Sequence, residues 1–499
     1  MTNSFYPHIL EPIAKSIVHY GTRNAFFIGG KAHSYEEFAG RIAAIRTAIA
    51  TNPGKNQVWG LALHDDLDTY ASIIALWMEG KAYVPLQGSQ PLERNLGIIA
   101  QVELDRIIDT TSDSPFGNFT VINPSELPST EFNQAFASAD DNALAYILFT
   151  SGSTGVPKGV PISRGNLAAF VQAFWDMGYE IGPEDRVLQC FNLTFDLSVM
   201  SYLIPLLRGA CVYTVPSDVV KTWYICRLMS EQRLTVALMT PSTIQYLRPY
   251  FDEFTFPDMR YSLFCGEALP LDTTEGWARC LPNAIIDNVY GPTEDTIFCT
   301  YYRFLRDAEN KAHNGVLSIG KSMTSGRIII VDDAGKETAP GEVGELCLAG
   351  GQLTAGYWKN PQKDAEVFWT AADGTRFYRT GDLCFSDTDG DILFVGRKDA
   401  QVKIQGFRVE LGEIEVNAKL YFTDGTMLIA MAFENADALT EIALFVQSAK
   451  NETRELEAFL RTKLPAYMVP SRYIFMEKFP VNKSEKIDRA ALKKLLNNE

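Results

Sequence analysis

Short apolar runs alternate with segments of helical spacing along most of the chain. Apolar residues recur at helical spacing in residues 69–79, between two of these runs. The runs are typical of buried strands and occupy residues 58–63, 82–86, 106–109, 145–149, 209–215, 235–239, 261–264 and 284–289. Strands that alternate with helices predict parallel sheets covered on both faces, in which ligands bind at the carboxyl ends of the strands.

The pattern changes in the last third of the chain. Apolar runs separated by Gly and Asp turns there predict a β-meander or barrel, and they occupy residues 327–331, 345–348 and 391–395. A charged turn follows at residues 396–399. Beyond it, two strand-like runs and the amphipathic segment 453–463 predict a small α+β unit. We therefore place a domain boundary between Lys398 and Asp399.

Composition narrows the class of protein. The 499 residues are 46% hydrophobic and 21% charged, which is typical of a soluble globular protein with more than one core. The net charge of −16 argues against binding to nucleic acid. The sequence has no apolar run of membrane-spanning length and no signal peptide at its start, so we expect a cytoplasmic protein that does not insert into membranes.

Cysteine and histidine residues give no sign of a metal site. The eight cysteines are scattered without a C-x-x-C pair, which predicts reduced and mostly buried thiols. The five histidines lack the spacing of metal ligands. We expect neither a structural zinc ion nor a histidine-based nucleophile.

The most informative stretch is F-T-S-G-S-T-G-V-P-K-G-V at residues 149–160, directly after a buried strand. Backbone N–H groups of such a Gly- and hydroxyl-rich loop can surround phosphate oxygens, and Lys158 adds a positive charge. The loop is not a Walker A motif, because Pro157 precedes the lysine and Gly159 follows it. A flexible surface loop is the alternative to a nucleotide site.

The complete string resembles the phosphate loop of the adenylate-forming superfamily, which includes acyl-CoA synthetases, luciferases and the adenylation domains of peptide synthetases. Five further strings match this superfamily in order: N-V-Y-G-P-T-E at 288–294, Y-R-T-G-D at 378–382, F-V-G-R at 394–397, K-I-Q-G-F-R-V-E-L-G-E at 403–413 and N-K-S-E-K-I-D-R at 482–489. The resemblance implies an α/β fold. It has a large domain, residues 1–398, with two doubly wound sheets and a distorted β-barrel, and a small mobile α+β domain, residues 399–499.

The resemblance also implies a site for ATP and Mg²⁺. Tyr290 offers an aromatic face to the purine, Asp382 accepts hydrogen bonds from the ribose, and Glu294 offers a hard oxygen to Mg²⁺. A turn before a strand, a capping Asp and a surface ion pair at Arg397 are the ordinary alternatives. The implied nucleotide contacts are Thr150, Ser151, Ser153, Thr154, Lys158, Asn288, Val289, Tyr290, Gly291, Pro292, Thr293, Asp382, Phe394 and Arg397.

Resemblance assigns the remaining steps to the end of the chain. Lys486 corresponds to the catalytic lysine of the superfamily, although Glu485 stands where the family usually has Gly, and Lys483 is the nearby competitor. Asp399 corresponds to the hinge. Lys403 is the second catalytic lysine and reaches the large domain only after the small domain rotates. Gly406 would then let a pantetheine arm pass close to the backbone, with a simple hairpin turn as the alternative.

The string N-L-T-F-D-L-S-V-M at residues 192–200 bears on the acid that is activated. By resemblance to the amino-acid-activating members of this superfamily, Asp196 pairs with the α-ammonium of the substrate. A carboxylate in such a pocket is costly to bury without a cation, which favours an amino acid; helix capping is the alternative. By resemblance to D-alanine–carrier protein ligases, Leu197, Met200, Cys265 and Ile297 line a small pocket.

The sequence contains no G-G-[HD]-S phosphopantetheine site. We therefore expect a monomeric enzyme that makes an aminoacyl-AMP from a small amino acid, with D-alanine as the first candidate, and loads a separate carrier protein. The alternatives are glycine, L-alanine or serine for a peptide-synthetase-like pathway, or a non-catalytic nucleotide-binding protein that keeps the fold.

Overall fold

The computed structural model describes residues 4–137, 140–152, 155–324, 326–399, 401–422, 426–480 and 487–496. By their contacts, the residues form two compact units. The first comprises Met1–Gln87, Ile99–Phe149 and Gly159–Lys398, and the second comprises Gly88–Ile98, Thr150–Lys158 and Asp399–Glu499. The phosphate loop thus has its contacts with the C-terminal segment of the chain.

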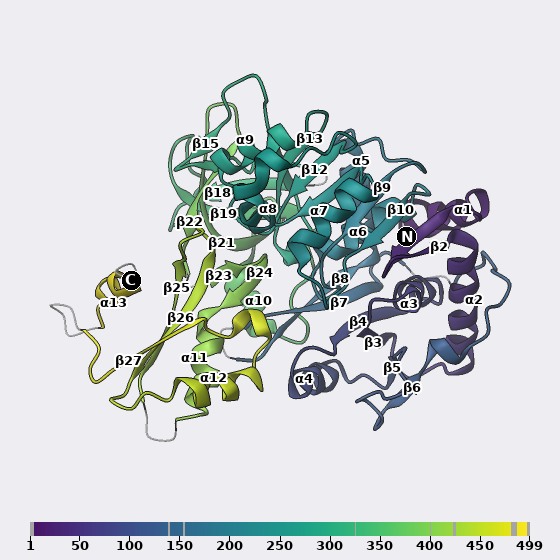
Figure 1. The fold of residues 1–499 in the computed structure, drawn as a ribbon, viewed down its shortest axis with the longest axis horizontal. Coiled ribbons are helices and arrows are strands. Elements are labelled where there is room, and N and C mark those ends of the chain that lie inside the picture. The colour runs from purple at the N-terminus through teal and green to yellow at the C-terminus, as the bar shows by residue number, and fades with distance from the viewer. Residues whose placement is uncertain are drawn as a thin grey trace. The chain divides into compact units, whose positions relative to one another are not determined.

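A nine-stranded sheet lies in the first unit, with a parallel centre and antiparallel edges (Figure 1). Its strands pair in the order β17 (Lys321–Ser322), β14 (Thr300–Arg303), β13 (Ile285–Tyr290), β12 (Tyr261–Phe264), β11 (Val236–Met239), β9 (Arg186–Gln189), β10 (Cys211–Thr214), β1 (Asn24–Ile28) and β2 (Lys31–Ser34). Four of the predicted runs form central strands here, and they are almost fully buried, as their continuous apolar character predicts.

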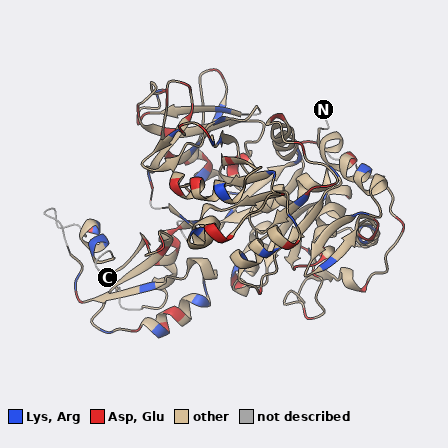
Figure 2. Cartoon of the chain, turned by 45° about the horizontal axis from the view of Figure 1, so that its top comes forward, with Lys and Arg blue, Asp and Glu red and all other residues tan. Residues whose placement is uncertain are grey.

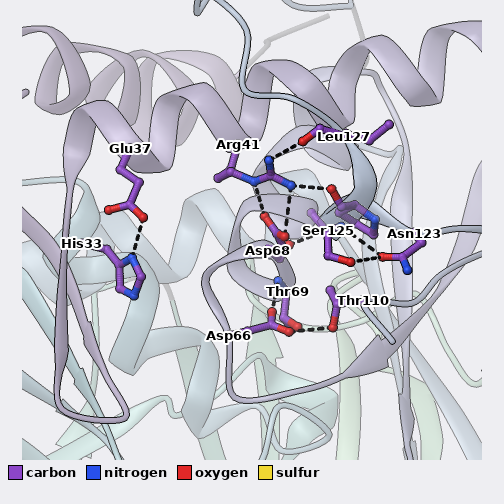
Figure 3. Close-up of polar contacts among 12 residues, drawn as sticks. His33, Glu37, Arg41, Asp66, Asp68, Thr69, Thr110, Asn123, Ser125 and Leu127 are labelled. Atoms are coloured by element: carbon purple, nitrogen blue, oxygen red, sulfur yellow. Dashed lines mark hydrogen bonds and ion pairs between the residues drawn. The ribbon is translucent and has the colours of Figure 1, made fainter. Parts of the chain in front are cut away.

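A second sheet of the first unit has six strands in the order β6 (Thr120–Ile122), β5 (Arg106–Ile108), β3 (Val58–Leu63), β4 (Ala82–Gln87), β7 (Leu144–Thr150) and β8 (Lys158–Ser163). Helix α3 (Leu67–Met78) connects β3 to β4, as the helical spacing predicts. It packs on α2 (Tyr35–Thr51), where Arg41 is ion-paired with Asp68 and donates to the carbonyl of Leu127 (Figure 3). The phosphate loop leaves β7.

The region after residue 315 forms a five-stranded antiparallel sheet. It runs in the order β18 (Gly326–Val331), β19 (Gly344–Gly350), β21 (Arg376–Ser386) and β20 (Phe368–Thr370), with β22 (Ile392–Arg397) paired to β21. In the described strands these pairings leave the sheet open. Together with the two doubly wound sheets, it confirms the predicted fold class of the large region.

Helices cover both large sheets of the first unit. Several begin with side-chain caps, such as the capping box of Ser163 and Asn166 at the start of α5. The remaining helices are α1 (Glu11–His19), α5 (Arg164–Asp176), α6 (Leu197–Leu206), α7 (Lys221–Glu231), α8 (Pro241–Leu247), α9 (Leu271–Cys280) and α10 (Pro361–Val367). The short pair β15 (Ala312–His313) and β16 (Val316–Leu317) completes the strands of this unit.

The second unit is an α+β arrangement with its own hydrophobic core, centred on Ile414, Leu444 and Leu456. Its strands are the hairpin β23 (Gln401–Ile404) and β24 (Phe407–Glu410), and a three-stranded sheet of β25 (Leu428–Glu434), β26 (Thr440–Gln447) and β27 (Arg472–Met476). Its helices are α4 (Leu92–Val102), of which residues 92–98 belong here, α11 (Leu411–Lys419), α12 (Thr453–Arg461) and α13 (Arg489–Leu496).

Basic and acidic residues are interspersed along the described ribbon (Figure 2). No described helix combines the length and apolar character that crossing a bilayer requires. All eight cysteines are buried thiols outside disulfide bonds, as predicted.

Candidate functional site

Asp196 stands at the first turn of α6, where the chain leaves β9 and enters the helix. It occupies the N-cap position, yet its side chain makes no capping hydrogen bond. The residue is 4% exposed, and its Oδ2 atom has no hydrogen-bond partner among the described residues. Helix capping therefore does not account for this carboxylate.

Opposing effects act on the ionisation of Asp196. Burial raises its pKa to about 7, and the nearby Glu294 carboxylate adds to the rise. The nearby Thr293 hydroxyl and the N–H groups of Leu197 and Ile297 act in the opposite direction and lower the pKa. No lysine or arginine in the described parts of the chain forms an ion pair with it. A cation that reached Oδ2 would therefore favour the charged form.

The four residues predicted to line the pocket are all buried in one hydrophobic core of the first unit. Leu197 and Met200 lie on α6, Cys265 follows β12, and Ile297 lies in the turn after β13. The structure thus brings residues from three separate elements into the core that contains the start of α6.

The turn after β13 carries Glu294, whose residue is fully buried. The Tyr357 hydroxyl donates to its Oε1 atom at 2.5 Å, and the Thr354 N–H donates to its backbone carbonyl at 2.8 Å. The described residues contain no group of three His, Cys, Asp or Glu side chains able to hold a metal. A single buried carboxylate still fits Mg²⁺, because this ion takes one or two protein carboxylates and completes its shell with phosphate and water oxygens.

The same turn is held by Gln352, a residue that sequence reasoning missed. Its side-chain amide donates to the carbonyls of Asp295, Thr296 and Phe298. Nothing in the local pattern marks this glutamine, since a polar residue after a strand is ordinarily part of a solvated turn. Here it is 1% exposed.

Asp382 on β21 meets Arg397, the last residue of β22, and Tyr290, the last residue of β13. Asp382 faces Arg397 across the β21–β22 pair, and the guanidinium donates to its Oδ1 at 2.6 Å. The Tyr290 hydroxyl donates to Oδ2 at 2.5 Å, and burial keeps that hydroxyl protonated by raising its pKa. Each carboxylate oxygen can accept more than one hydrogen bond, so Asp382 retains capacity for two adjacent hydroxyls.

Other predicted nucleotide residues lie on β22, on β13 and in the turn after β13. Phe394 packs with Tyr290 in a small core. The Asn288 amide donates to the carbonyls of Leu317 and Ser318, and Val289 is buried. At Gly291 a Cβ atom would lie 2.4 Å from the Cα of Phe298, so only glycine fits there. Pro292 directly precedes Thr293 in the turn.

The phosphate loop makes its contacts within the second unit. Ser151 Oγ donates to the Arg408 carbonyl at 2.6 Å, and the Gly152 N–H donates to Glu413 Oε2 at 3.1 Å. Lys158 lies 3.3 Å from Glu410 Oε1. The Thr150 hydroxyl has no partner in the described residues, and Ser153 and Thr154 lie outside them.

Glu413 is fully buried and is also ion-paired with Arg94 at 2.6 Å. One carboxylate therefore receives a backbone N–H from the loop and a guanidinium from α4. Lys158 has a carboxylate beside it in the same way. Two donors of the loop, the Gly152 N–H and the Lys158 ammonium, thus contact carboxylates of the same unit.

Three residues assigned to the later steps, Asp399, Lys403 and Gly406, lie in or just before the β23–β24 hairpin. Lys403 pairs with Arg408 across the hairpin, whose turn contains Gln405 and Gly406 with φ of 51° and 84°. Two successive positive φ values are typical of a tight two-residue turn, so Gly406 occupies the turn of this hairpin. Asp399 Oδ1 accepts the Gln401 N–H at 3.2 Å. Lys486 lies outside the described residues.

Comparison with known proteins identifies the family. The AMP-binding enzyme family matches residues 13–358. Tyrocidine synthase 2 of Brevibacillus parabrevis is 31% identical over 92% of this chain. The D-alanine–D-alanyl carrier protein ligase of Lacticaseibacillus casei strain BL23 is 28% identical over 97% of this chain and 98% of its own length.

Coverage of the relatives differs widely. This chain spans 13% of tyrocidine synthase 2 and 43% of tyrocidine synthase 1, both from Brevibacillus parabrevis. Among solved structures, the Vibrio cholerae adenylation domain AlmE in complex with glycyl-adenosine-5'-phosphate is 25% identical. It has a TM-score of 0.86 over 98% of this chain and 97% of its own. The chain therefore belongs to the AMP-binding enzyme family.

Proposed function

We propose that the protein activates a small amino acid with ATP and then passes the aminoacyl group to the phosphopantetheine thiol of a separate carrier protein. The observation that carries the proposal is the buried Asp196 carboxylate, whose Oδ2 atom has no partner among the described residues. A substrate α-ammonium supplies both the donor and the charge that this oxygen lacks. A fatty or aryl acid would leave the carboxylate unpaired.

In the first step, a carboxylate oxygen of the amino acid attacks the α-phosphorus of ATP. The new O–P bond forms as the bond to the β-phosphate breaks, and pyrophosphate leaves. The two anions repel by about 4 kcal/mol at 4 Å with an effective dielectric constant near 20. Lys486 places a positive charge between them, and the donors of the phosphate loop hold the leaving group.

Glu294 is the residue that would hold Mg²⁺, which supplies positive charge to the phosphate oxygens when bound. Asp382 orients the ribose through its two oxygens, and Arg397 and Tyr290 in turn fix the orientation of Asp382.

In the second step, the carrier thiolate attacks the acyl carbon. The C–S bond forms as the acyl C–O bond to AMP breaks, and AMP leaves. We assign this step to a second arrangement, reached when residues 399–499 rotate about Asp399 and bring Lys403 and Gly406 to the acyl group. Reduced, buried cysteines and the use of ATP agree with a cytoplasmic reaction.

D-Alanine is the substrate that we favour, because a relative matched over 98% of its own length is a D-alanine–D-alanyl carrier protein ligase. Glycine is the second candidate, because the AlmE structure is a complex with glycyl-adenosine-5'-phosphate. Leu197, Met200, Cys265 and Ile297 are all buried, which suits a side chain no larger than a methyl group.

The test is ATP–pyrophosphate exchange with D-alanine, L-alanine, glycine, serine and a fatty acid. We expect exchange with small amino acids and the highest kcat/KM with D-alanine. Exchange that is no faster with D-alanine than with L-alanine or glycine would reject the substrate assignment. Exchange with the fatty acid alone, or with no acid, would reject amino-acid activation altogether.

A further inference from the structure

Gln352 lies just after β19 and reaches across to the turn that follows β13. Its Nε2 atom donates to the carbonyl oxygens of Asp295, Thr296 and Phe298 at 3.2, 3.2 and 2.9 Å. Its backbone carbonyl also accepts the Thr296 hydroxyl at 2.5 Å. One buried residue therefore makes four hydrogen bonds to a four-residue stretch of another element.

The turn needs such support because its backbone is strained. Thr296 and Ile297 have φ of 48° and 77°, in the left-handed region that β-branched residues rarely adopt. Conformations of this kind persist only where the surroundings determine them. Phe298 is also backed by Gly291, where any side chain would collide with it.

The strained turn is also the part of the molecule that faces Asp196. The Ile297 N–H and the Thr293 hydroxyl lie close enough to the Asp196 carboxylate to lower its pKa. If the backbone at Ile297 relaxed, its N–H would move away from Asp196, and the surroundings of the carboxylate that binds the substrate would change. The geometry around Asp196, where the substrate ammonium is proposed to bind, thus depends on four hydrogen bonds made by Gln352, which is not itself a proposed substrate contact.

We propose that Gln352 is a positioning residue of the amino-acid site, which holds the strained backbone of Thr296 and Ile297 in place beside Asp196. This inference rests on the proposed amino-acid activation. It assigns to Gln352 control over amino-acid affinity and over the ionisation of Asp196, while the nucleotide residues Tyr290, Asp382 and Arg397 remain unaffected.

The charged and titratable groups that act on Asp196 set the expected pH response. They are Glu294 in the turn and Tyr146 on β7. Burial raises the pKa of Tyr146 well above its ordinary value, so this group stays neutral near pH 7. Loss of the Ile297 N–H would remove one of the interactions that lower the pKa of Asp196, and the apparent pKa would rise.

The test compares Gln352→Leu with the unmodified enzyme in ATP–pyrophosphate exchange between pH 5.5 and 8.5. Loss of the hydrogen bonds that position a binding group changes the affinity for the substrate by about tenfold. We expect KM for the amino acid to rise about tenfold, KM for ATP to stay within about twofold, and the apparent pKa of kcat/KM for the amino acid to rise. Gln352→Asn keeps an amide but shortens the side chain, and should show the same changes more weakly.

Thr354→Val is the matched control. Thr354 is equally buried, lies on the same segment and loses a hydroxyl bond to the Pro161 carbonyl, yet its backbone N–H to Glu294 remains. It should lower the melting temperature without moving the pH profile. If folded Gln352→Leu or Gln352→Asn keeps the parent KM and apparent pKa, the inference is wrong. Absence of exchange in the parent enzyme with every amino acid would instead reject the proposed function.

Discussion

At the scale of single residues, the ionisation of Asp196 connects the structure to a measurable rate. The pKa near 7 results mainly from burial, and the ammonium of a substrate binds the carboxylate form. Free enzyme with a protonated Asp196 has lost the charge that would pair with the substrate. The pH profile of the reaction with limiting amino acid therefore reports this one group.

We expect kcat/KM for the amino acid to fall about tenfold per pH unit below pH 7 and to level off above it. Asp196→Asn should lower kcat/KM by about one hundredfold at pH 8 and flatten this limb of the profile. Initial rates of ATP–pyrophosphate exchange at limiting amino acid measure both effects. A parent profile that is flat from pH 5.5 to 8 would contradict the assignment.

The raised pKa of Asp196 also makes the stability of the folded protein depend on pH. Folding raises the pKa of Asp196 from 3.8 to about 7, so protonation of Asp196 stabilises the folded state relative to high pH. This contribution is complete below pH 3.8 and is lost as the pH rises through 7. Asp196→Asn removes the buried charge. Its melting temperature should therefore exceed that of the parent by about 1–2 °C at pH 8, and the difference should shrink at pH 5. Differential scanning calorimetry at the two pH values tests the sign.

Lys486 permits a second test at this scale. Lys486→Ala should reduce exchange by about 1,000-fold or more, because the charge between two reacting anions is lost, while ATP binding measured by calorimetry stays nearly unchanged. Lys483→Ala, three residues earlier, is the control and should keep most of the activity. If the two variants exchange their phenotypes, Lys483 is the catalytic lysine.

At the scale of elements, a buried ion pair joins α4 to α11, and the phosphate loop shares its carboxylate. Arg94 and Glu413 are 8% and 0% exposed, and the carboxylate also accepts the Gly152 N–H. Removing one member of a buried pair leaves an uncompensated charge, which costs about 3–5 kcal/mol. The neighbouring pair of Glu93 and Lys463 is largely exposed on the Glu93 side.

Glu413→Gln should therefore lower the free energy of unfolding by about 3 kcal/mol, whereas Glu93→Gln should change it by less than about 1 kcal/mol. Both substitutions remove one negative charge from pairs that involve α4, so the comparison isolates burial. Urea unfolding followed by fluorescence measures the two changes. Equal effects would mean that water reaches Glu413.

Alternation of short apolar runs with helical segments was sufficient to predict the sheets and the α+β end of the chain, because buried strands need continuous apolar character. The candidate site could be predicted only as a set of motifs. The charge of Asp196 depends on Thr293 and Glu294, which lie far along the chain, and the Glu413–Arg94 contact joins residues 319 positions apart. No local pattern encodes such distances, and none marks Gln352.

At the scale of the whole molecule, the two proposed reactions need different arrangements of the residues after Asp399. Lys403→Ala is therefore expected to spare ATP–pyrophosphate exchange and to slow loading of the carrier by about tenfold or more. Transfer of radiolabelled amino acid to a phosphopantetheinylated carrier measures the second step. Lys419→Ala, an exposed lysine at the end of α11, is the control. Equal loss of both steps in Lys403→Ala would contradict a role confined to transfer.

The burial of all eight cysteines has a practical meaning for such assays. Burial raises the pKa of Cys211 to about 12 and that of Cys280 to about 11, so these thiols are neither accessible nor ionised at neutral pH. The native enzyme should be almost silent to a colorimetric disulfide reagent. In a mixture with its carrier, the pantetheine sulfur would then be the dominant reactive thiol, and its disappearance would report aminoacylation in real time without a radiolabel.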